Sequence, residues 1–219
     1  MNNIFKYLSI LYLMFFFTGC SSVTAQYPEI KTELDRRVKN FLEENAGKWY
    51  DMNVPLSDGR ILYDLIIKNN YRKAVEIGTS TGHSAIWIAW ALSKTGGKLI
   101  TIEIDKKRYL TAQANFKKAG LSEYIDARLA DAHELVPRLP GPYDFVFSDA
   151  DKEWYKNYFI ALDPKLEPGG CFTAHNTAMP VNGIREFLDY VRSLSNYTTE
   201  IDRSSRSGIS ISYKKKPVP

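Results

Sequence analysis

Four apolar, strand-like segments of this sequence end in side chains that could bind a ligand or react with it. The first runs into the glycine-rich stretch AVEIGTSTGHSA, at residues 74–85, and the second contains Glu103. Asp149 closes a third segment, and His175 with Asn176 closes a fourth. The carboxyl ends of parallel strands meet at one edge of a sheet, where α/β folds bind their ligands. The spacing therefore predicts one ligand site.

The glycine-rich stretch narrows the choice of ligand. An ATP-binding loop continues as Gly-Lys-Ser/Thr, so that the lysine meets the phosphates, but Gly82 is followed by His83 and Ser84. A dinucleotide-binding loop has glycine at its first, third and sixth positions, whereas counting from Gly78 the third position is Ser80 and the sixth is His83. ATP and NAD both fit poorly, and a dehydrogenase is disfavoured.

Glu103 suits a ligand that carries a ribose. A carboxylate at the end of the second strand can accept hydrogen bonds from both ribose hydroxyls of an adenosine cofactor. A carboxylate that closes an apolar strand is costly to bury without a partner, which favours a binding role.

The segments that must position these residues alternate between strand and helix patterns from Lys73 onward. We expect an α/β, Rossmann-like, doubly wound fold with a mostly parallel seven-stranded sheet. Strands are expected at 73–77, 98–104, 124–130, 143–150, 169–175, 197–202 and 208–214, and helices at 83–94, 105–120, 131–139, 153–166 and 184–194. Two amphipathic helices, at 29–45 and 59–70, precede the first strand.

The first 20 residues differ from the rest of the chain. Lys6 precedes the apolar run YLSILYLMFFFT, which is shorter than the roughly 20 residues of a membrane-spanning helix. The ending FTGC resembles a bacterial lipobox with Phe17 at an unusual position, so we expect Cys20 to be lipidated. This predicts a signal peptide at 1–20, a linker at 21–28 and a membrane-anchored lipoprotein of the cell envelope. The alternative is an uncleaved anchor or a misassigned start codon, with a cytoplasmic protein if the segment is no signal.

The remaining composition indicates one globular domain, at residues 29–216. The 29 basic and 25 acidic residues give a net charge of +4 and are intermixed, so no nucleic acid partner is expected. The basic run Lys214 to Lys216 is typical of a solvated tail. Cys171 lies in an apolar run and is expected to be a buried thiol without a disulfide.

Five motifs together resemble a known family. VEIGTSTGHSAIWIA, TIEID, LADAHELV, YDFVFSDADKEWY and LEPGG are similar to the cation-dependent O-methyltransferases, the class I S-adenosylmethionine (SAM) enzymes that include caffeoyl-CoA and catechol O-methyltransferases. The likeness covers roughly residues 50–176. It implies the class I methyltransferase fold, SAM as cofactor and methyl transfer to a hydroxyl of a small acceptor, with phenols and catechols among the candidates.

The resemblance also implies a set of cofactor-binding residues. It assigns Glu76, Gly78, Thr79, Gly82 and Ser84 to the methionine end of SAM, Glu103 to the ribose, Asp131 and Ala132 to the neighbourhood of the adenine, and Asp149 to the same pocket. Simpler interpretations stay open: the two glycines can serve only to turn the chain, and Asp131 can serve only as a helix N-cap.

In this family a divalent cation is held by an aspartate after the fourth strand and an Asp-Asn pair after the fifth. The cation lowers the pKa of the bound hydroxyl, and a lysine takes the proton. Asp149, Lys152 and Asn176 match this pattern, but His175 stands where the second aspartate is expected. Because Mg²⁺ prefers oxygen ligands and imidazole suits softer metals, we expect a weakened magnesium site.

Three interpretations of His175 follow. It is a general base in a metal-independent enzyme, since its reference pKa near 6.5 suits proton removal at neutral pH; or it binds a softer metal with Asp149 and Asn176; or it is a strand-end histidine with satisfied hydrogen bonds. His83 and His133 are expected to begin helices without taking part in chemistry.

The stretch after Asn176 is less similar to the family. Ser207 and Gly208 stand where the family has Asp-Gly, which leaves acceptor contacts and a homodimer open. Trp154, Tyr155, Met179 and the two N-terminal helices are candidates to cover a flat aromatic acceptor, and Trp154 and Tyr155 can equally be ordinary packing residues. A second function also stays open: SAM is made in the cytoplasm, so an envelope protein of this fold can be a non-catalytic binding protein.

Overall fold

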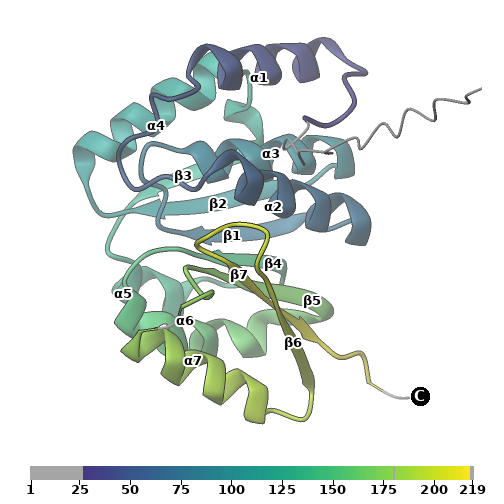
Figure 1. Ribbon diagram of the computed structural model, residues 1–219, viewed down its shortest axis with the longest axis vertical. Helices are drawn as coiled ribbons and strands as arrows, with labels where there is room; N and C mark the ends of the chain where they lie inside the picture. The colour runs from purple at the N-terminus through teal and green to yellow at the C-terminus, as the bar shows by residue number, and fades with distance from the viewer. Residues whose placement is uncertain (1–26, 180, 218–219) are drawn as a thin grey trace, which may run out of the picture.

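The computed structural model describes residues 27–179 and 181–217, and its centre is one sheet of seven strands. The strands lie in the order β3-β2-β1-β4-β5-β7-β6 (Figure 1). They span Lys73–Ile77 (β1), Lys98–Glu103 (β2), Ile125–Leu129 (β3), Tyr143–Ser148 (β4), Leu166–His175 (β5), Tyr197–Asp202 (β6) and Ile209–Lys214 (β7). Strands β1 to β5 are parallel, and β7 runs antiparallel to both of its neighbours. The expected doubly wound, mostly parallel sheet is confirmed.

Helices cover both faces of this sheet. They span Glu33–Glu44 (α1), Leu56–Asn69 (α2), His83–Thr95 (α3), Lys106–Ala119 (α4), Ala132–Leu135 (α5), Tyr155–Leu162 (α6) and Asn182–Ser193 (α7). Helices α1 to α4 share one hydrophobic cluster with the first face, and α6 and α7 share the other cluster with the second (Figure 1). Within the part of the chain that the structure describes, every helix is too short or too polar to span a membrane.

The two N-terminal helices begin at different residues from those expected. Helix α1 begins at Glu33 because the Thr32 side chain caps it in a capping box, which leaves Ile30 outside the helix. Helix α2 begins at Leu56, before the expected start at Gly59, with Pro55 as its N-cap residue. The earlier start places Asp58 in the first turn of α2.

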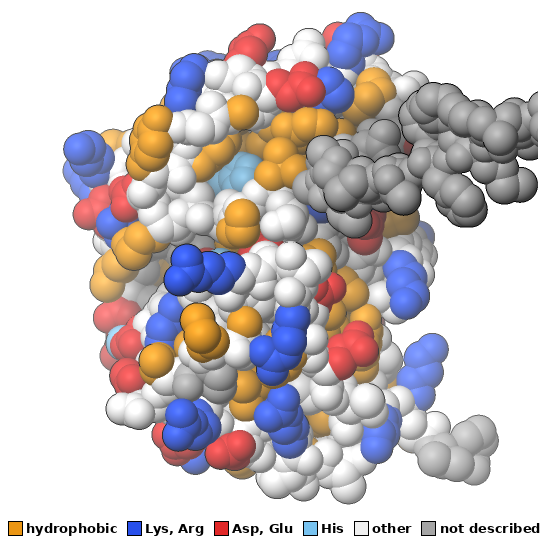
Figure 2. Space-filling view, in the orientation of Figure 1, with side chains coloured by type: hydrophobic (Ala, Val, Ile, Leu, Met, Phe, Trp, Pro, Cys, Tyr) orange, Lys and Arg blue, Asp and Glu red, His pale blue; other side chains and the backbone are white. Residues whose placement is uncertain are grey.

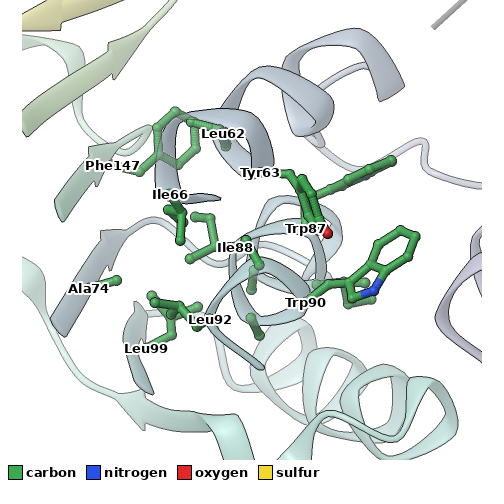
Figure 3. Packing of buried hydrophobic residues seen from close by; sticks show 14 of the residues in the cluster. Leu62, Tyr63, Ile66, Ala74, Trp87, Ile88, Trp90, Leu92, Leu99 and Phe147 are labelled. Atoms are coloured by element: carbon green, nitrogen blue, oxygen red, sulfur yellow. The ribbon is translucent and has the colours of Figure 1, made fainter. Parts of the chain in front are cut away.

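Helix α3 is buried on all sides, which explains why its sequence is apolar throughout. Trp87 and Trp90 are fully buried and pack against Tyr63 of α2 (Figure 3). Gly59 makes this contact close, since a Cβ added there would lie 2.2 Å from Cδ1 of Trp87. The start of α2 is therefore held against α3, which leads directly from the glycine-rich turn.

One smaller expectation is also confirmed, because Cys171 is a fully buried free thiol of β5. Gly120 ends α4 in the left-handed conformation. Basic and acidic side chains are interspersed over the face shown in Figure 2 rather than separated by sign.

Candidate active site

A pocket of about 640 Å³ opens where strands β1 to β5 end. It lies across the β1 and β4 ends, where the strand order reverses, which is the usual ligand position in an α/β sheet. Its wall contains most of the residues singled out from the sequence: Gly78, Glu103, Asp131, Ala132, Asp149, Lys152, His175 and Asn176. The structure thus brings together residues from all five strand ends.

The turn after β1 requires glycine for two reasons. Gly78 has a φ of +96°, and a Cβ added there would lie 2.6 Å from the backbone oxygen of Asp149. The amides of Gly78 and Thr79 both donate to the carbonyl of Ile102, 3.1 Å away. The turn therefore packs directly onto the ends of β2 and β4 and leaves an open cradle above Gly78.

Glu103 is held at the pocket wall by backbone amides. Its Oε2 accepts a hydrogen bond from the amide of Ser80 at 2.7 Å, and its Oε1 accepts one from the amide of Asp105 at 2.9 Å. The side chain is 6% exposed, and that exposed part faces the pocket. Each carboxylate oxygen keeps a further lone pair, so the group can accept hydrogen bonds from a ribose diol.

Four residues assigned to the methionine end do not line the pocket. Glu76, Thr79, Gly82 and Ser84 lie around or beneath the turn. The Thr101 hydroxyl donates to Oε2 of Glu76, while Oε1 is fully buried and has no partner. Burial raises the pKa of Glu76 to about 8, although hydrogen bonds from Ser84 and Thr101 lower it.

The cradle above Gly78 and the pocket-facing end of Glu103 both bear on whether SAM fits. Gly78 lines the pocket and has no side chain, so a ligand can approach the backbone of the turn closely there. The exposed end of Glu103 supplies acceptors for a sugar. The residues present therefore fit SAM.

The end of β3 forms the opposite wall of the pocket. Asp131 caps α5 by accepting a hydrogen bond from the amide of His133 at 2.8 Å, and it also lines the pocket. His133 begins α5 as expected, but its ring is part of the pocket wall and stacks on Trp154 with ring centres 3.9 Å apart. Trp154 therefore supports this wall.

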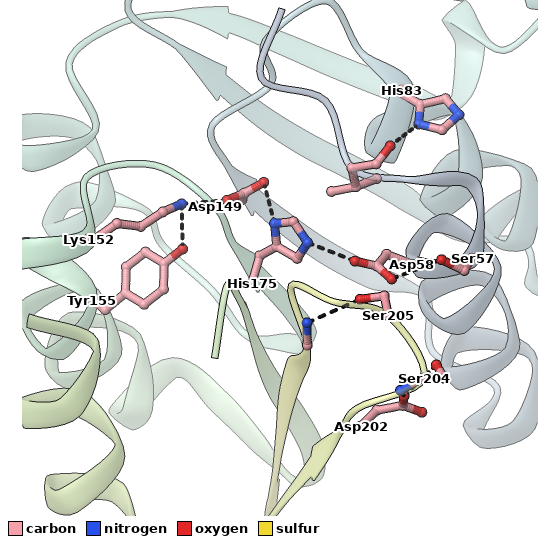
Figure 4. Close-up of polar contacts among 12 residues, drawn as sticks. Ser57, Asp58, His83, Asp149, Lys152, Tyr155, His175, Asp202, Ser204 and Ser205 are labelled. Atoms are coloured by element: carbon pink, nitrogen blue, oxygen red, sulfur yellow. Dashed lines mark hydrogen bonds and ion pairs between the residues drawn. The ribbon is translucent and has the colours of Figure 1, made fainter. Parts of the chain in front are cut away.

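Four charged side chains, Asp58, His175, Asp149 and Lys152, form a continuous series of contacts, and the last three line the other half of the pocket (Figure 4). Nε2 of His175 lies 2.8 Å from Oδ2 of Asp58, and its Nδ1 lies 3.2 Å from Oδ2 of Asp149. Nζ of Lys152 donates to Oδ1 of Asp149 at 2.5 Å and to the hydroxyl of Tyr155 at 2.9 Å. Asp58 is fully buried and His175 is 5% exposed, so this pair is shielded from water, whereas the Lys152 side chain is 31% exposed.

The carboxylates on either side keep His175 positively charged. Burial lowers the pKa of this histidine, but hydrogen bonds and charge from Asp149 and Asp58 outweigh burial and raise the pKa to about 9. Both ring nitrogens face a carboxylate oxygen, so neither is free for another partner. The arrangement corresponds to the third interpretation of His175, a strand-end histidine with satisfied hydrogen bonds.

The same geometry does not fit the metal site expected from Asp149, His175 and Asn176. A histidine binds a metal through the lone pair of a neutral ring, and neither nitrogen of this imidazolium has one free. Both oxygens of Asp149 already accept hydrogen bonds from cationic groups. The described residues contain no group of three or more His, Cys, Asp or Glu side chains suited to a metal ion.

Asp58 is the site residue that sequence reasoning missed. Its partner His175 is 117 positions away in the chain, and no local sequence motif indicates that the two residues are in contact. A signal existed in the stretch PLSDG, where proline and an acidic residue mark a helix start, but it does not reveal what the acid contacts. Tyr155 is fully buried and belongs to the Lys152 contact, whereas Met179 is 71% exposed.

Comparison with known proteins agrees with this site. A family model described as O-methyltransferase matches residues 23–183. The chain belongs to the O-methyltransferase family. This O-methyltransferase is 34% identical over 152 residues to a catechol O-methyltransferase of Niastella koreensis, covering 62% of this chain and 68% of the relative. It is 33% identical over 160 residues to a flavonoid 3',5'-methyltransferase of Vitis vinifera, covering 70% and 67% of the two chains.

Solved structures show the same architecture. The Bacillus cereus O-methyltransferase in complex with SAH superposes with a TM-score of 0.71 at 25% identity, over 86% of this chain and 92% of that chain. The Streptomyces achromogenes O-methyltransferase of tomaymycin synthesis, solved with SAM, shares the fold with a TM-score of 0.69 at 24% identity, over 85% and 92%. This O-methyltransferase is a SAM-dependent enzyme of the class I fold.

Proposed function

We propose that this O-methyltransferase methylates a hydroxyl of a small phenolic acceptor that lies against Lys152, Asp149 and His175. The observation that carries the proposal is the placement of Glu103 and the Lys152–Asp149 pair on the walls of one pocket. When bound, SAM supplies a methyl group on a positively charged sulfur atom. The chain must orient the acceptor toward that group and take the proton of its hydroxyl.

Lys152 is the proposed proton acceptor. Its contacts with Asp149 and the Tyr155 hydroxyl hold Nζ at the pocket wall in one position. Acting as the base, the Lys152 amine takes the proton of the acceptor hydroxyl and becomes an ammonium. The new oxygen–carbon bond then forms at the acceptor as the sulfur–carbon bond breaks, and the products are a methyl ether and neutral SAH. The ammonium formed on Lys152 then lies beside the oxyanion and stabilises it.

The apolar part of the wall supports a flat aromatic acceptor. Met52 and Ile104 line the pocket, yet they are 68% and 67% exposed. Large apolar side chains at the mouth of a pocket are typical of a site that an apolar ligand covers. The relatives named for catechol, flavonoid and caffeoyl-CoA methylation also support this acceptor class.

The test is product formation by the full-length chain with SAM and a panel of catechol, caffeic acid and a monophenol. We expect a methyl ether detected by mass spectrometry, and we expect Lys152→Met to lower kcat by about 100-fold or more. Lys156→Met is the matched control, because Lys156 pairs with Glu186 on the exposed face of α6. SAM binding without a methylated product from any acceptor would contradict catalysis and favour a non-catalytic binding protein.

We also propose that Cys20 carries a lipid that anchors the protein in the cell envelope. Cys20 and the predicted signal peptide lie outside the described residues. The family match begins at residue 23, which supports the assignment of the preceding segment to targeting rather than to the enzyme domain.

The two cysteines allow a matched test of the anchor. We expect labelled palmitate to be incorporated into the wild type and into Cys171→Ala, whose substitution lies in the buried core, but not into Cys20→Ala. Fractionation should move Cys20→Ala out of the membrane fraction. An unlabelled wild-type chain in the cytosol would contradict the anchor and point to the cytoplasmic alternative.

A further inference from the structure

We propose that His175, with one ring nitrogen against Asp58 and the other against Asp149, blocks the place of the family's divalent cation, so that this O-methyltransferase works without a metal ion. This inference rests on the proposed methyl transfer at the same pocket. Its structural basis is the unbroken series of contacts from Asp58 through His175 and Asp149 to Lys152 (Figure 4).

The contacts of Asp149 argue against a cation beside it. One of its oxygens faces the imidazolium at 3.2 Å, and the other faces the ammonium of Lys152 at 2.5 Å. A divalent ion bound to Asp149 would have to displace Lys152 or His175, since each oxygen of Asp149 already has one of them as its partner. Asn176, the other expected ligand, is neutral and cannot offset that repulsion.

Lys152 can perform part of the cation's electrostatic task. It lines the pocket, and its contact with Asp149 holds it in a fixed position. Preorganised positive charge lowers the energy of an oxyanion that forms beside it. The acceptor oxygen would therefore be stabilised by the ammonium that Lys152 forms on taking the proton, instead of by a Lewis acid.

Asp58 acts in this arrangement as a positioning residue. It comes from the first turn of α2, where the helix dipole favours a negative charge, and its Oδ1 accepts a hydrogen bond from the Ser57 hydroxyl at 3.2 Å. It is fully buried and contacts His175 on the side away from Asp149. Asp58 contacts Nε2 of His175, and this contact holds the ring so that Nδ1 faces Asp149.

The first test measures metal binding directly, by manganese titration calorimetry and electron paramagnetic resonance on the full-length chain. We expect no Mn²⁺ binding to the wild type at millimolar concentration, and less than a twofold change in turnover when a chelator is added. His175→Asp should gain a Mn²⁺ site, since it places three carboxylates and Asn176 around the former imidazole. His175→Asn has the same shape without the charge and should gain none.

The outcomes separate this inference from the proposed function. Stoichiometric Mn²⁺ binding by the wild type, or turnover lost to a chelator and restored by Mn²⁺, would overturn it. A folded His175→Asp variant that fails to bind Mn²⁺ would also overturn it, because His175 would then not be what excludes the cation. Metal binding is measured without an acceptor, so these results hold even if no methylated product is found.

A second test addresses Asp58. We expect Asp58→Asn to lower kcat by about 10-fold or more while the Kd for SAM changes less than twofold, and we expect Asp58→Glu to recover part of the loss. Asp64→Asn, an exposed acid on the same helix, is the control. An equal loss of SAM affinity in Asp58→Asn would indicate general damage to the fold and contradict a positioning role.

Discussion

The two halves of the pocket hold their charges in different ways. In the cofactor half, formed at the ends of β1 to β3, the Glu103 carboxylate is satisfied by the backbone amides of Ser80 and Asp105. In the acceptor half, formed at the ends of β4 and β5 with the start of α2, side chains of opposite charge satisfy one another. The first half follows the family pattern, whereas the second departs from it at His175.

This difference shows how one half of a site can change while the other is kept. Backbone amides are set by the fold, so any sequence with the same turn presents them to Glu103. The two halves meet at Gly78, which packs against the backbone oxygen of Asp149 rather than against its side chain. The turn therefore fixes the backbone of Asp149, whereas neighbouring side chains determine the partners of its carboxylate.

The largest effect expected from a single change is the loss of SAM binding in Glu103→Ala. Two hydrogen bonds from a ribose to a carboxylate contribute about 1.5–3 kcal/mol each, which corresponds to at least about a 100-fold rise in Kd. Titration calorimetry with SAM measures it. Glu123→Gln, at an exposed acid before β3, is the control.

The same variant checks that the halves are independent. In Glu103→Ala the contacts among Lys152, Asp149 and His175 should persist. The variant should therefore still fail to bind Mn²⁺, as we expect of the wild type. If Glu103→Ala bound SAM as tightly as the wild type does, Glu103 would not be the main SAM contact of the cofactor half.

Two buried histidines sharpen the comparison, because they predict opposite pH dependences of folding stability. Although burial lowers it, the pKa of His175 lies at about 9 because Asp149 and Asp58 face the ring, with Lys152 behind Asp149. Burial lowers the pKa of His83 to about 4, and only a weaker contribution from a backbone carbonyl opposes it.

The sign of each effect follows from the unfolded value near pH 6.5. The raised pKa of His175 stabilises the fold below pH 6.5, and this stability is lost as the pH rises toward 9. The lowered pKa of His83 stabilises the fold above pH 6.5, and this stability is lost as the pH falls toward 4. Each contribution is about 3 kcal/mol.

Urea unfolding across this pH range measures both contributions. We expect His175→Gln to abolish the loss of folding stability at alkaline pH and His83→Gln to abolish the loss at acid pH. His133→Gln, at a partly exposed histidine, serves as the control. Wild-type stability that stays level from pH 6.5 to 9 would show that His175 is not held by its carboxylates.

Much of the fold and of the cofactor half could be predicted from the sequence because the signals are local. The β1 and β6 bounds match the expected ranges, and Glu103 and Gly78 lie where the strand-end pattern puts them. Alternating strands and helices, a glycine-rich turn and a strand-end acid each depend on a few neighbouring residues. For Glu76 and Ser84 the pattern gave the right neighbourhood without showing that the turn covers them.

The acceptor half could not be predicted in the same way. The spacing placed His175 at a strand end, but its charge depends on Asp58, which reaches it only because α2 starts at Leu56 and packs against α3. A contact between such distant segments depends on tertiary packing and leaves no periodic signal. The departure from the family pattern at His175 was visible in the sequence, whereas the contact between His175 and the carboxylate of Asp58 was not.

The smallest expected effect concerns the packing that brings α2 to the site. In Gly59→Ala the new Cβ would lie within 3 Å of the fully buried Trp87 ring, so the start of α2 must shift away from α3. Overpacking of this kind costs about 1–3 kcal/mol of folding stability. We expect lower stability in urea unfolding together with a several-fold fall in kcat, because Asp58 moves with the helix.

The control for this substitution is Lys68→Ala in the exposed last turn of α2. It should leave both stability and kcat close to those of the wild type. SAM affinity separates the halves once more: Gly59→Ala should bind SAM as the wild type does, since Glu103 and its backbone donors do not belong to α2. If Gly59→Ala lost stability but kept full kcat, the contact between Asp58 and His175 would not depend on how α2 packs, and the acceptor half would be as locally determined as the cofactor half.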